Sequence, residues 1–197
     1  MTRDPDLQAL LDALASDCAR AAPAAGENGH RTCAQVLSLA QAAPGQPGTT
    51  PPATLPACAH LPQALATAEQ GPFAATARAL ASLAPRLAWT RRATARPSDQ
   101  PFWDGHGNAM LLGPGGLETR ADLWIGLSLV APGVTYPDHD HAPEEAYLPL
   151  GPGAWFNSAM GWADPQGRGL IYNPPGITHA MRATPGAPLF AVWLLPH

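Results

Sequence analysis

The segment Thr135–Leu150, TYPDHDHAPEEAYLPL, contains two histidines, two tyrosines, two glutamates and two aspartates within sixteen residues. No other stretch of the chain is as dense in side chains that bind metals or transfer protons. His139 and His141 are one residue apart, so both imidazoles point to the same face if the segment is a strand. Glu145 follows at a distance that allows a tight turn to return its carboxylate to the histidines. The segment is therefore either a polar surface loop or the main part of an active site.

A further histidine follows a proline turn near the C-terminus, where Pro174–His179 reads PPGITH. The turn predicts that His179 stands at the start of a strand. Two or three histidines and one carboxylate on adjacent strands of a small barrel form a site for one divalent metal ion, with open positions for water or substrate. Zinc, ferrous iron and manganese all suit such ligands, and the choice among them stays open. The spacings of His141, Glu145 and His179 agree with this site, whereas ligation by His139 is left open.

Short runs of apolar, aromatic or alternating residues recur from residue 86 to the C-terminus. Turn sequences such as GPGG, APG, GPG and PPG separate many of them. Short strands at this spacing predict an antiparallel sandwich or barrel rather than alternating strands and helices. The expected strands are Arg86–Arg92, Asn108–Leu112, Leu123–Ala131, Glu145–Leu150, Ala154–Ser158, Gly169–Asn173, His179–Ala183 and Leu189–Leu195.

The first 85 residues are helical in style and carry little chemistry. Their leucines and alanines recur at the spacing of amphipathic helices, and a segment rich in proline and glycine interrupts them. We therefore expect an α-helical N-terminal extension over residues 1–85 and a β-barrel with the metal site over residues 86–197. The expected helices are Asp6–Ala22, with Leu7, Leu10, Leu11 and Leu14 on one face, Arg31–Ala42, and Leu61–Leu83 with a break around Gly71–Pro72, while Pro44–Pro56 is expected to be a loop.

The composition excludes several classes of protein. All eleven cationic residues are arginines, which excludes Schiff-base chemistry and a P-loop because both need a lysine. A net charge of −4 without a basic stripe argues against a nucleic-acid partner, and no GxGxxG stretch indicates a dinucleotide site. Three cysteines without CxxC spacing, and an N-terminus with neither a secretion signal nor a membrane span, predict a soluble, cytoplasmic protein with reduced thiols. The oligomeric state is left open.

The two histidine-containing segments resemble the two motifs of the cupin barrels. That resemblance implies a mainly β fold, a single cupin barrel (double-stranded β-helix or jelly roll) behind the helical extension. Three departures concern turn lengths and not the ligands: Gly151 is one position early, Gly169 is one late, and Ala183 replaces an asparagine. The matching positions are Gly133, His139, His141 and Glu145 in the first motif, and Pro174, Gly176 and His179 in the second.

The longer string Y-x2-H-x-H-x3-E-x-Y, from Tyr136 to Tyr147, is similar to that of bacterial dimethylsulfoniopropionate (DMSP) lyases of the DddQ type. A helical segment before a single barrel adds to this likeness over nearly the whole chain. The resemblance implies that His141, Glu145, His179 and, as an optional fourth ligand, Tyr147 bind the metal, and that His139 lies beside the substrate.

Such an enzyme would be a carbon–sulfur lyase that converts DMSP, a small molecule, to dimethyl sulfide and acrylate by base-catalysed β-elimination. The metal would neutralise the substrate carboxylate and stabilise the charge that develops beside it. A tyrosine, with a usual pKa of about 10, serves as a base only where a nearby cation favours its phenolate. We favour Tyr136 as the base, because Tyr147 would be partly committed to the metal. Tyr136, Tyr147 and His139 are thus the predicted catalytic residues.

The sulfonium end of such a substrate needs an apolar site that attracts cations. Aromatic faces attract organic cations without offering a competing acceptor. The sequence contains six tryptophans, and several lie on or near expected strands. The predicted substrate-binding residues are Trp124, Trp155, Trp193 and Tyr172.

Two other functions fit the same ligands. A cupin dioxygenase or isomerase would use the metal on a different small carboxylate, and a sensor cupin would bind the metal without catalysis. The two tyrosines beside the ligands favour the lyase, because oxygen chemistry at iron needs no phenolic base. A sensor predicts that Tyr136→Phe leaves its behaviour unchanged.

Overall fold

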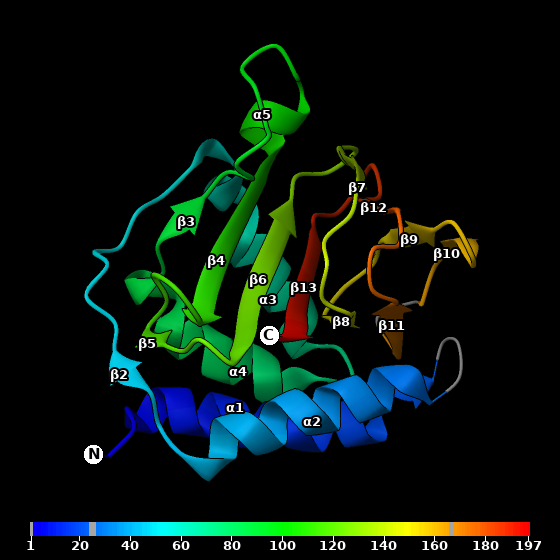
Figure 1. Cartoon of the computed structure of the whole chain (residues 1–197). Helices are drawn as coiled ribbons and strands as arrows, with labels where there is room; N and C mark the ends of the chain where they lie inside the picture. Colours follow the sequence, from blue (N-terminus) through cyan, green and yellow to red (C-terminus); the bar gives the residue numbers. More distant parts are fainter. Residues whose placement is uncertain (1, 24–26, 166–167) are drawn as a thin grey trace.

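Two β-sheets in the C-terminal part of the chain enclose an apolar interior (Figure 1). The computed structural model describes residues 2–23, 27–165 and 168–197. Within these described ranges the larger sheet has nine strands, and β3 (Trp89–Thr90) pairs with β4 outside the main order. The main order across this sheet is β1 (Ala22–Pro23), β11 (Gly169–Asn173), β8 (Glu145–Pro149), β13 (Leu189–Pro196), β6 (Leu123–Val130), β4 (His106–Leu112), β5 (Glu118–Thr119) and β2 (Gln46–Pro47). The smaller sheet consists of β10 (Gly161–Ala163), β9 (Ala154–Asn157), β12 (His179–Arg182) and β7 (Thr135–His139).

This arrangement is the expected mainly β barrel behind a helical extension, and each run expected to be a strand overlaps one. Side chains from both sheets fill the interior in a shared cluster, among them Val130 of β6 and Met181 of β12. Apart from β7, the strands missing from the expected runs are short: β1, β2, β5 and β10 have two or three residues each. Runs of that length carry no periodicity, so only their pairing partners define them.

The larger sheet is buried on both faces, and the alternation of side chains along each strand decides what faces the barrel. On β8, Ala146 and Leu148 pack into the core shared with the helices. The alternate residues, Glu145 and Tyr147, line the pocket on the barrel side. On β6, Leu127 faces the helices in the same way. The helical layer therefore supports the strand that carries two of the predicted site residues.

Four helices cover the outer face of the larger sheet (Figure 1). The Asp4 carboxylate caps the first helix by accepting hydrogen bonds from the backbone N–H groups of Asp6 and Leu7. The expected break near Gly71–Pro72 is confirmed, because one helix ends at Glu69 and the next begins at Ala74. The helices are α1 (Pro5–Arg20), α2 (Asn28–Ala42), α3 (Leu61–Glu69) and α4 (Ala74–Leu83). A 3-10 turn at Pro56–His60 precedes α3, another at Ala84–Arg86 follows α4, and the short helix α5 (Phe102–Gly105) lies between β3 and β4.

Helices and barrel share one apolar core, in which leucines of α1 lie in the same cluster as Leu127 and Val192 of the sheet. The packing is therefore continuous across residue 85. The expected domain boundary at that residue stays a prediction. In the described residues, every helix is too short or too polar to cross a membrane.

A buried ion pair ties the N-terminal segment to the barrel. Arg3 Nε lies 2.7 Å from Glu118 Oε2, and both side chains are about 5% exposed or less. The backbone N–H of Gly45 donates to the other carboxylate oxygen at 2.8 Å. Burial opposes ionisation of Glu118, but the hydrogen bonds from Arg3 and Gly45 and the nearby guanidinium charges outweigh it and lower its pKa.

Glu118→Gln is expected to lower the free energy of unfolding by about 3 kcal/mol at neutral pH, because it leaves the Arg3 charge buried without a partner. The pKa of Glu118 is lower in the folded protein than its usual value of 4.5. The ion pair therefore stabilises the fold fully above pH 4.5, and this stabilisation is lost as the pH falls through the folded-state pKa. Urea unfolding of both proteins at neutral and acidic pH should show the difference shrinking in acid. Asp122→Asn, which alters an exposed partner of Arg120, is the control and should cost about 0.5 kcal/mol. Equal losses in the two variants would contradict the role of the buried pair.

Candidate metal centre

Cross-strand pairing brings the two histidine-containing segments together. His179, at the start of β12, pairs with His139, at the end of β7. Glu145, at the start of β8, pairs with Asn173, at the end of β11. The strand β7 ends at His139, so His141 lies in the loop that follows it. The expected strand does not extend over both histidines, although both side chains line the same pocket.

The proline turn also contacts the first motif directly. The backbone N–H of Gly176 donates a hydrogen bond of 2.9 Å to the carbonyl of His141. Gly176 has a φ of +67°, which glycine adopts at little cost. As expected, the turn leads into a strand that begins at His179. One hydrogen bond thus couples the loops that carry His141 and His179.

Three side chains converge in the barrel to form a group that could hold a metal ion: His141, Glu145 and His179, whose ligand atoms all lie within 4.8 Å of one another. Glu145 Oε2 is 3.3 Å from His141 Nε2 and 3.4 Å from His179 Nε2. His179 Nε2 is buried and has no hydrogen-bond partner among the described residues. A buried nitrogen without a partner beside a carboxylate fits a metal ligand, since an orphaned polar atom otherwise costs stability.

The hydrogen bonds of the two histidines point the correct ring nitrogen at the centre. The Nδ1 atom of His141 lies 2.9 Å from the carbonyl of Pro143, and that of His179 lies 2.9 Å from the carbonyl of Ile177. A carbonyl can only accept, so Nδ1 carries the proton and Nε2 offers its lone pair in the neutral ring. Backbone carbonyls commonly fix metal-binding histidines in this way. The residues present therefore fit a divalent ion.

The carboxylate of Glu145 is ionised and held in place. Burial would raise its pKa, but the adjacent imidazoles of His141 and His179 outweigh burial and lower the pKa to about 2. Asn173 Nδ2 also donates to Glu145 Oε2 at 3.2 Å. A charged carboxylate oriented by an amide is a suitable hard ligand for zinc, ferrous iron or manganese.

His139 lies beside this group but outside it. Its ring is 3.9 Å from that of His179 and 4.8 Å from that of Tyr136. Its Nδ1 donates to the carbonyl of Pro137 at 2.9 Å. Burial and the neighbouring His179 lower its pKa to about 3, so the ring is neutral at physiological pH. His139 therefore lines the pocket without belonging to the ligand group.

Two tyrosines flank the group, one from each sheet. Tyr136, on β7, accepts a hydrogen bond of 3.3 Å from Asn108 Nδ2, whose Oδ1 accepts from Ser128 Oγ at 2.8 Å. Burial raises the pKa of Tyr136, while the Asn108 hydrogen bond and the charge of Arg92 act against the rise. Burial and the carboxylate of Glu145 raise the pKa of Tyr147, on β8, well above its usual value. Without an added cation, both environments disfavour phenolate, and that of Tyr136 does so less than that of Tyr147.

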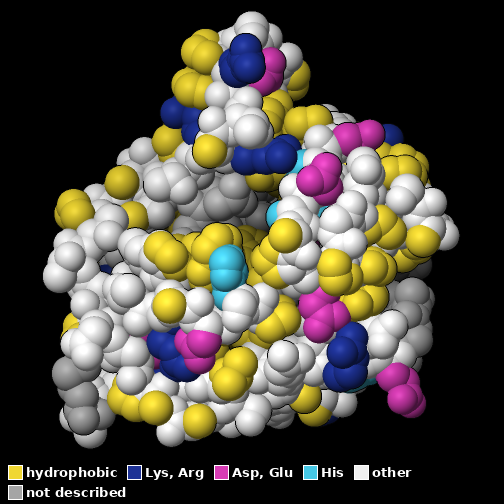
Figure 2. Space-filling view, viewed as in Figure 1, with side chains coloured by type: hydrophobic (Ala, Val, Ile, Leu, Met, Phe, Trp, Pro, Cys, Tyr) yellow, Lys and Arg dark blue, Asp and Glu magenta, His cyan; other side chains and the backbone are white. Residues whose placement is uncertain are grey.

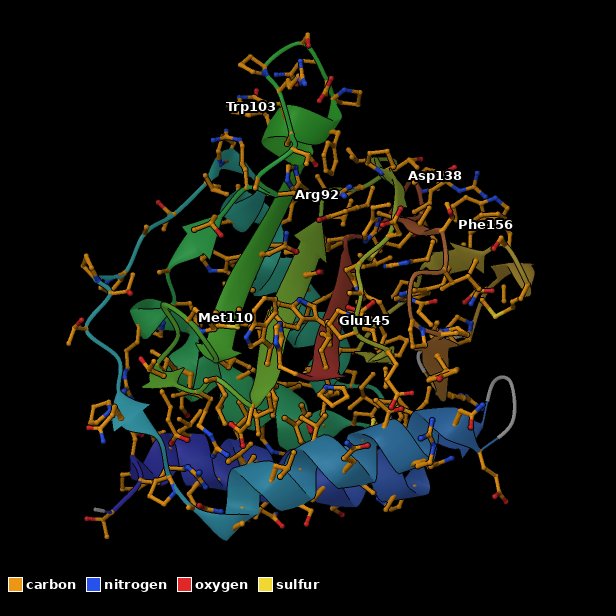
Figure 3. All side chains as sticks on the ribbon, viewed as in Figure 1. Arg92, Trp103, Met110, Asp138, Glu145 and Phe156 are labelled. Carbon is orange, nitrogen blue, oxygen red and sulfur yellow. The ribbon has the colours of Figure 1, made fainter. Side chains whose placement is uncertain are left out.

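These groups open onto a cavity of about 450 Å³. Figure 2 shows histidine side chains inside a hollow of this face, beneath arginine side chains. In Figure 3, Arg92 lies near the upper ends of β4 and β6, and Glu145 lies lower, beside β13. The lining residues are Arg92, Ala93, Asn108, Trp124, Ser128, Tyr136, His139, Asp140, His141, Glu145, Tyr147, Trp193 and Leu195.

Two of the four predicted substrate-binding residues line this cavity, and two do not. Trp124 and Trp193 form part of its wall. Trp155 instead packs in the barrel interior with Leu189. Tyr172 turns outward, because it alternates with the inward Ile171 on β11, and its hydroxyl donates to Glu144 Oε2 at 2.7 Å. Neither Trp155 nor Tyr172 is placed to touch a ligand in the pocket.

The sequence of this chain matches a family model described as dimethylsulfoniopropionate lyase over residues 28–191. The chain belongs to the DMSP lyase family. DddL, a proposed DMSP lyase of Cereibacter sphaeroides, is 35% identical over 130 residues, which are 66% of this chain and 54% of that protein. This chain therefore spans about half the length of that relative.

Two solved structures share the fold of this DMSP lyase family member. A structure reported with the DMSP lyases RdDddP and RnDddQII superposes with a TM-score of 0.70 at 22% identity, covering 98% of this chain and 92% of the other. DMSP lyase DddQ from Ruegeria pomeroyi superposes with a TM-score of 0.64 at 20% identity, covering 88% and 93%. The DMSP lyase family expected from the string between Tyr136 and Tyr147 is confirmed by the family match.

Four polar residues of the pocket of this DMSP lyase family member were not predicted from the sequence: Arg92, Asn108, Ser128 and Asp140. A signal existed for two of them. Asn108 and Ser128 are isolated polar residues in the otherwise apolar or small runs HGNAMLL and LWIGLSLV, and they pair across β4 and β6. A polar residue at an inward position of a buried strand needs a partner, and each supplies the other.

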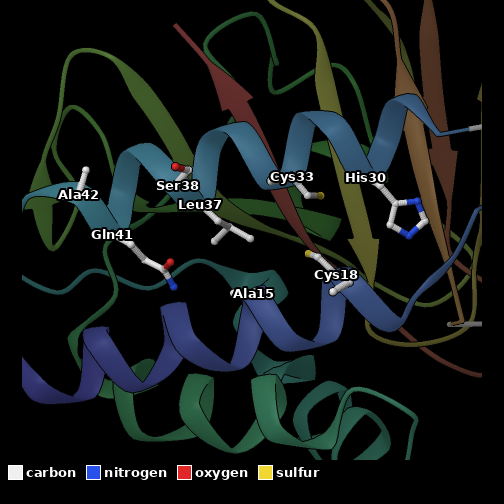
Figure 4. A pocket seen from close by; sticks show the side chains of 10 residues that line it. Ala15, Cys18, His30, Cys33, Leu37, Ser38, Gln41 and Ala42 are labelled. Carbon is white, nitrogen blue, oxygen red and sulfur yellow. The ribbon is translucent and has the colours of Figure 1, made fainter.

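A larger cavity of about 620 Å³ lies between α1 and α2, away from the metal group (Figure 4). Cys18 and Cys33 line it, and both are buried. A hydrogen bond to Cys33, together with burial, raises the pKa of the Cys18 thiol well above its usual value. That thiol is therefore a poor nucleophile at neutral pH.

Proposed function

We propose that this chain is a metal-dependent carbon–sulfur lyase that cleaves DMSP to dimethyl sulfide and acrylate. Membership of the DMSP lyase family supports the substrate. The observation that carries the reaction type is a pair of tyrosines beside the ligand group His141, Glu145 and His179, within one cavity. A base and an electrophilic site are the two components that β-elimination from a carboxylate requires.

The three ligands would hold one divalent ion, with Tyr147 as an optional fourth ligand through its phenol oxygen. Bound there, the ion would act as a Lewis acid that neutralises the substrate carboxylate and increases the acidity of the adjacent carbon. We identify zinc, ferrous iron and manganese as candidates, because two imidazoles and one carboxylate suit each of them.

Tyr136 is the proposed base. In the elimination it removes a proton from the carbon next to the carboxylate, the electron pair of that C–H bond forms the new double bond, and the C–S bond breaks with its electrons going to sulfur. Asn108 donates to the Tyr136 hydroxyl and thus favours its phenolate form. His139, neutral and 4.8 Å from the Tyr136 ring, is placed to contact the substrate without competing for the metal.

The apolar wall of the cavity suits the other end of the substrate. Trp124 and Trp193 present indole rings, and Leu195 pairs with Trp124 across β13 and β6. Indole faces attract a sulfonium ion and also accommodate its methyl groups. The same wall would release dimethyl sulfide readily, since the neutral product no longer benefits from the cation–π attraction.

The proposal is tested by mixing purified protein with DMSP and measuring both products. Dimethyl sulfide by headspace gas chromatography and acrylate by proton NMR should appear in equal amounts, without consumption of oxygen. Oxygen uptake with small carboxylates, and no sulfide, would favour a dioxygenase. Metal binding without turnover of DMSP would favour a sensor.

Gly126→Ala tests the aromatic wall. Gly126 pairs with Trp193 across the sheet, and a Cβ at this position would overlap the indole ring and lie 2.7 Å from the carbonyl of Ala109. The indole must shift into the cavity, so kcat/KM for DMSP should fall at least about 10-fold, at a stability cost of about 1–3 kcal/mol. Gly186→Ala, at a glycine with open space around it, should change neither quantity. Unchanged kcat/KM in Gly126→Ala would remove Trp193 from the proposed binding wall.

A further inference from the structure

Arg92 brings an unpaired positive charge to the cavity. It follows β3 on the chain, lines the pocket, and its guanidinium carbon lies 6.0 Å from the centre of the Tyr136 ring. Among the described residues, no carboxylate forms an ion pair with it. The preceding residue differs: Arg91 is paired with Asp104 at 3.1 Å and stacks on the Trp103 ring at 4.1 Å.

A buried histidine that the elimination does not use holds Arg92 at the cavity. The backbone N–H of Arg92 donates to His106 Nε2 at 3.0 Å. His106 is fully buried, its Nδ1 donates to the carbonyl of Phe102 at 2.6 Å, and its ring stacks on the Phe102 ring at 3.7 Å. Burial lowers the pKa of His106, so Nε2 remains an acceptor at neutral pH. The backbone at Arg92 is thus held by a rigid, packed group.

Arg92 and the aromatic wall lie toward opposite ends of the same strand. His106, which binds the Arg92 backbone, pairs with Val130 at the end of β6. Trp124 lies near the start of β6 and pairs with Leu195. Trp124 and Val130 are six residue steps apart, which corresponds to roughly 20 Å between their backbones, and the side chains of Arg92 and Trp124 both line the cavity. The cavity therefore has a cationic end and an aromatic end.

Charge decides which group each end receives. A half-buried guanidinium without a counter-ion is stabilised by an anion, and its planar geometry matches a carboxylate. It would repel a sulfonium, which the indole rings at the other end attract. The one other acid among the lining residues, apart from Glu145, is Asp140, and it forms no ion pair with Arg92 in the described part of the chain.

We propose that Arg92 contributes to binding the carboxylate of the substrate, which the proposed metal ion would also neutralise, and that His106 positions Arg92 for this role. Arg92 would then orient a zwitterion in the cavity, with its carboxylate toward Arg92 and its cationic end toward Trp124 and Trp193. The inference rests on the proposed function for the identity of the substrate, but carboxylate binding at Arg92 can be measured without turnover.

The test compares wild type, Arg92→Gln, Arg92→Lys and the neighbouring control Arg91→Gln. Binding of propionate and of the uncharged propionamide to the purified protein, with its metal content matched, is measured by calorimetry. The Kd for propionate should rise about 10- to 100-fold in Arg92→Gln and less in Arg92→Lys, in line with the loss of a charged hydrogen bond. Propionamide binding, and both ligands with Arg91→Gln, should be unchanged. The KM for DMSP should rise more than kcat falls.

Two results would overturn the inference. One is propionate binding that is absent in wild type or equal in wild type and Arg92→Gln. The other is an Arg92→Gln effect confined to kcat and its pH profile, which would mean that the charge acts on Tyr136 and not on the substrate. Arg92-dependent propionate binding in a protein that does not cleave DMSP would instead refute the proposed function alone.

Discussion

His179→Ala is expected to abolish metal binding and lower the rate of dimethyl sulfide release at least about 1000-fold. The variant removes a buried ring nitrogen that has no other partner among the described residues, and it leaves only His141 and Glu145 of the ligand group. Two ligands hold a divalent ion far less firmly than three. Metal content by mass spectrometry, measured beside the rate, separates loss of the ion from loss of chemistry.

The matched control is His60→Ala, a histidine at the end of a 3-10 turn outside the cavity, which should retain both metal and rate. Circular dichroism of His179→Ala should match wild type, since the barrel interior is otherwise unchanged. Full activity in His179→Ala, or a full complement of metal, would contradict the proposed ligand group.

Tyr136→Phe is expected to lower kcat about 100- to 10,000-fold while the metal stays bound. The change removes only the hydroxyl, and the ring keeps its edge contact with Phe102 at 4.9 Å between centroids. Because the base must be deprotonated, the wild-type rate should rise with pH as Tyr136 loses its proton. This rise should be absent from the pH–rate profile of the variant. Tyr172→Phe, outside the cavity, is the control and should behave as wild type.

Tyr147→Phe distinguishes the two tyrosines. If Tyr147 acts as a ligand, its loss weakens metal affinity, and added metal should restore part of the rate. If Tyr147→Phe removes activity with the metal in place and Tyr136→Phe does not, the base is Tyr147. Near-normal rates in both variants would exclude a phenolic base altogether.

Much of the fold was predictable from local patterns. The leucine spacing of α1 and the proline signal between α3 and α4 are local, and the structure confirms both. The strands from β4 to β13 that exceed three residues were largely found because turn sequences separate them. In contrast, β2 exists only because Gln46 and Pro47 pair with β5, about seventy residues later, and no local signal reports such a pairing.

The candidate site also contains residues that local sequence patterns predict and residues that only tertiary packing defines. His141, Glu145 and His179 were named from spacing and family resemblance, and the structure brings their ligand atoms together. Their roles await experiment. Arg92 was missed because its importance depends on an anchor, His106, that is fourteen residues away and fully buried. Trp155 was misplaced because facing the barrel interior is not the same as facing the cavity, a distinction that only tertiary packing makes.

The central claim is that one metal ion at His141, Glu145 and His179 enables the elimination. The most direct test is to strip the protein with a chelator, return zinc, ferrous iron or manganese in increments, and measure dimethyl sulfide release from DMSP at each step. We predict no release from the metal-free protein and a rate that rises linearly to a plateau at one ion per chain for at least one metal. Full activity in metal-free protein, or no sulfide from protein that holds one ion of each metal, would contradict the claim.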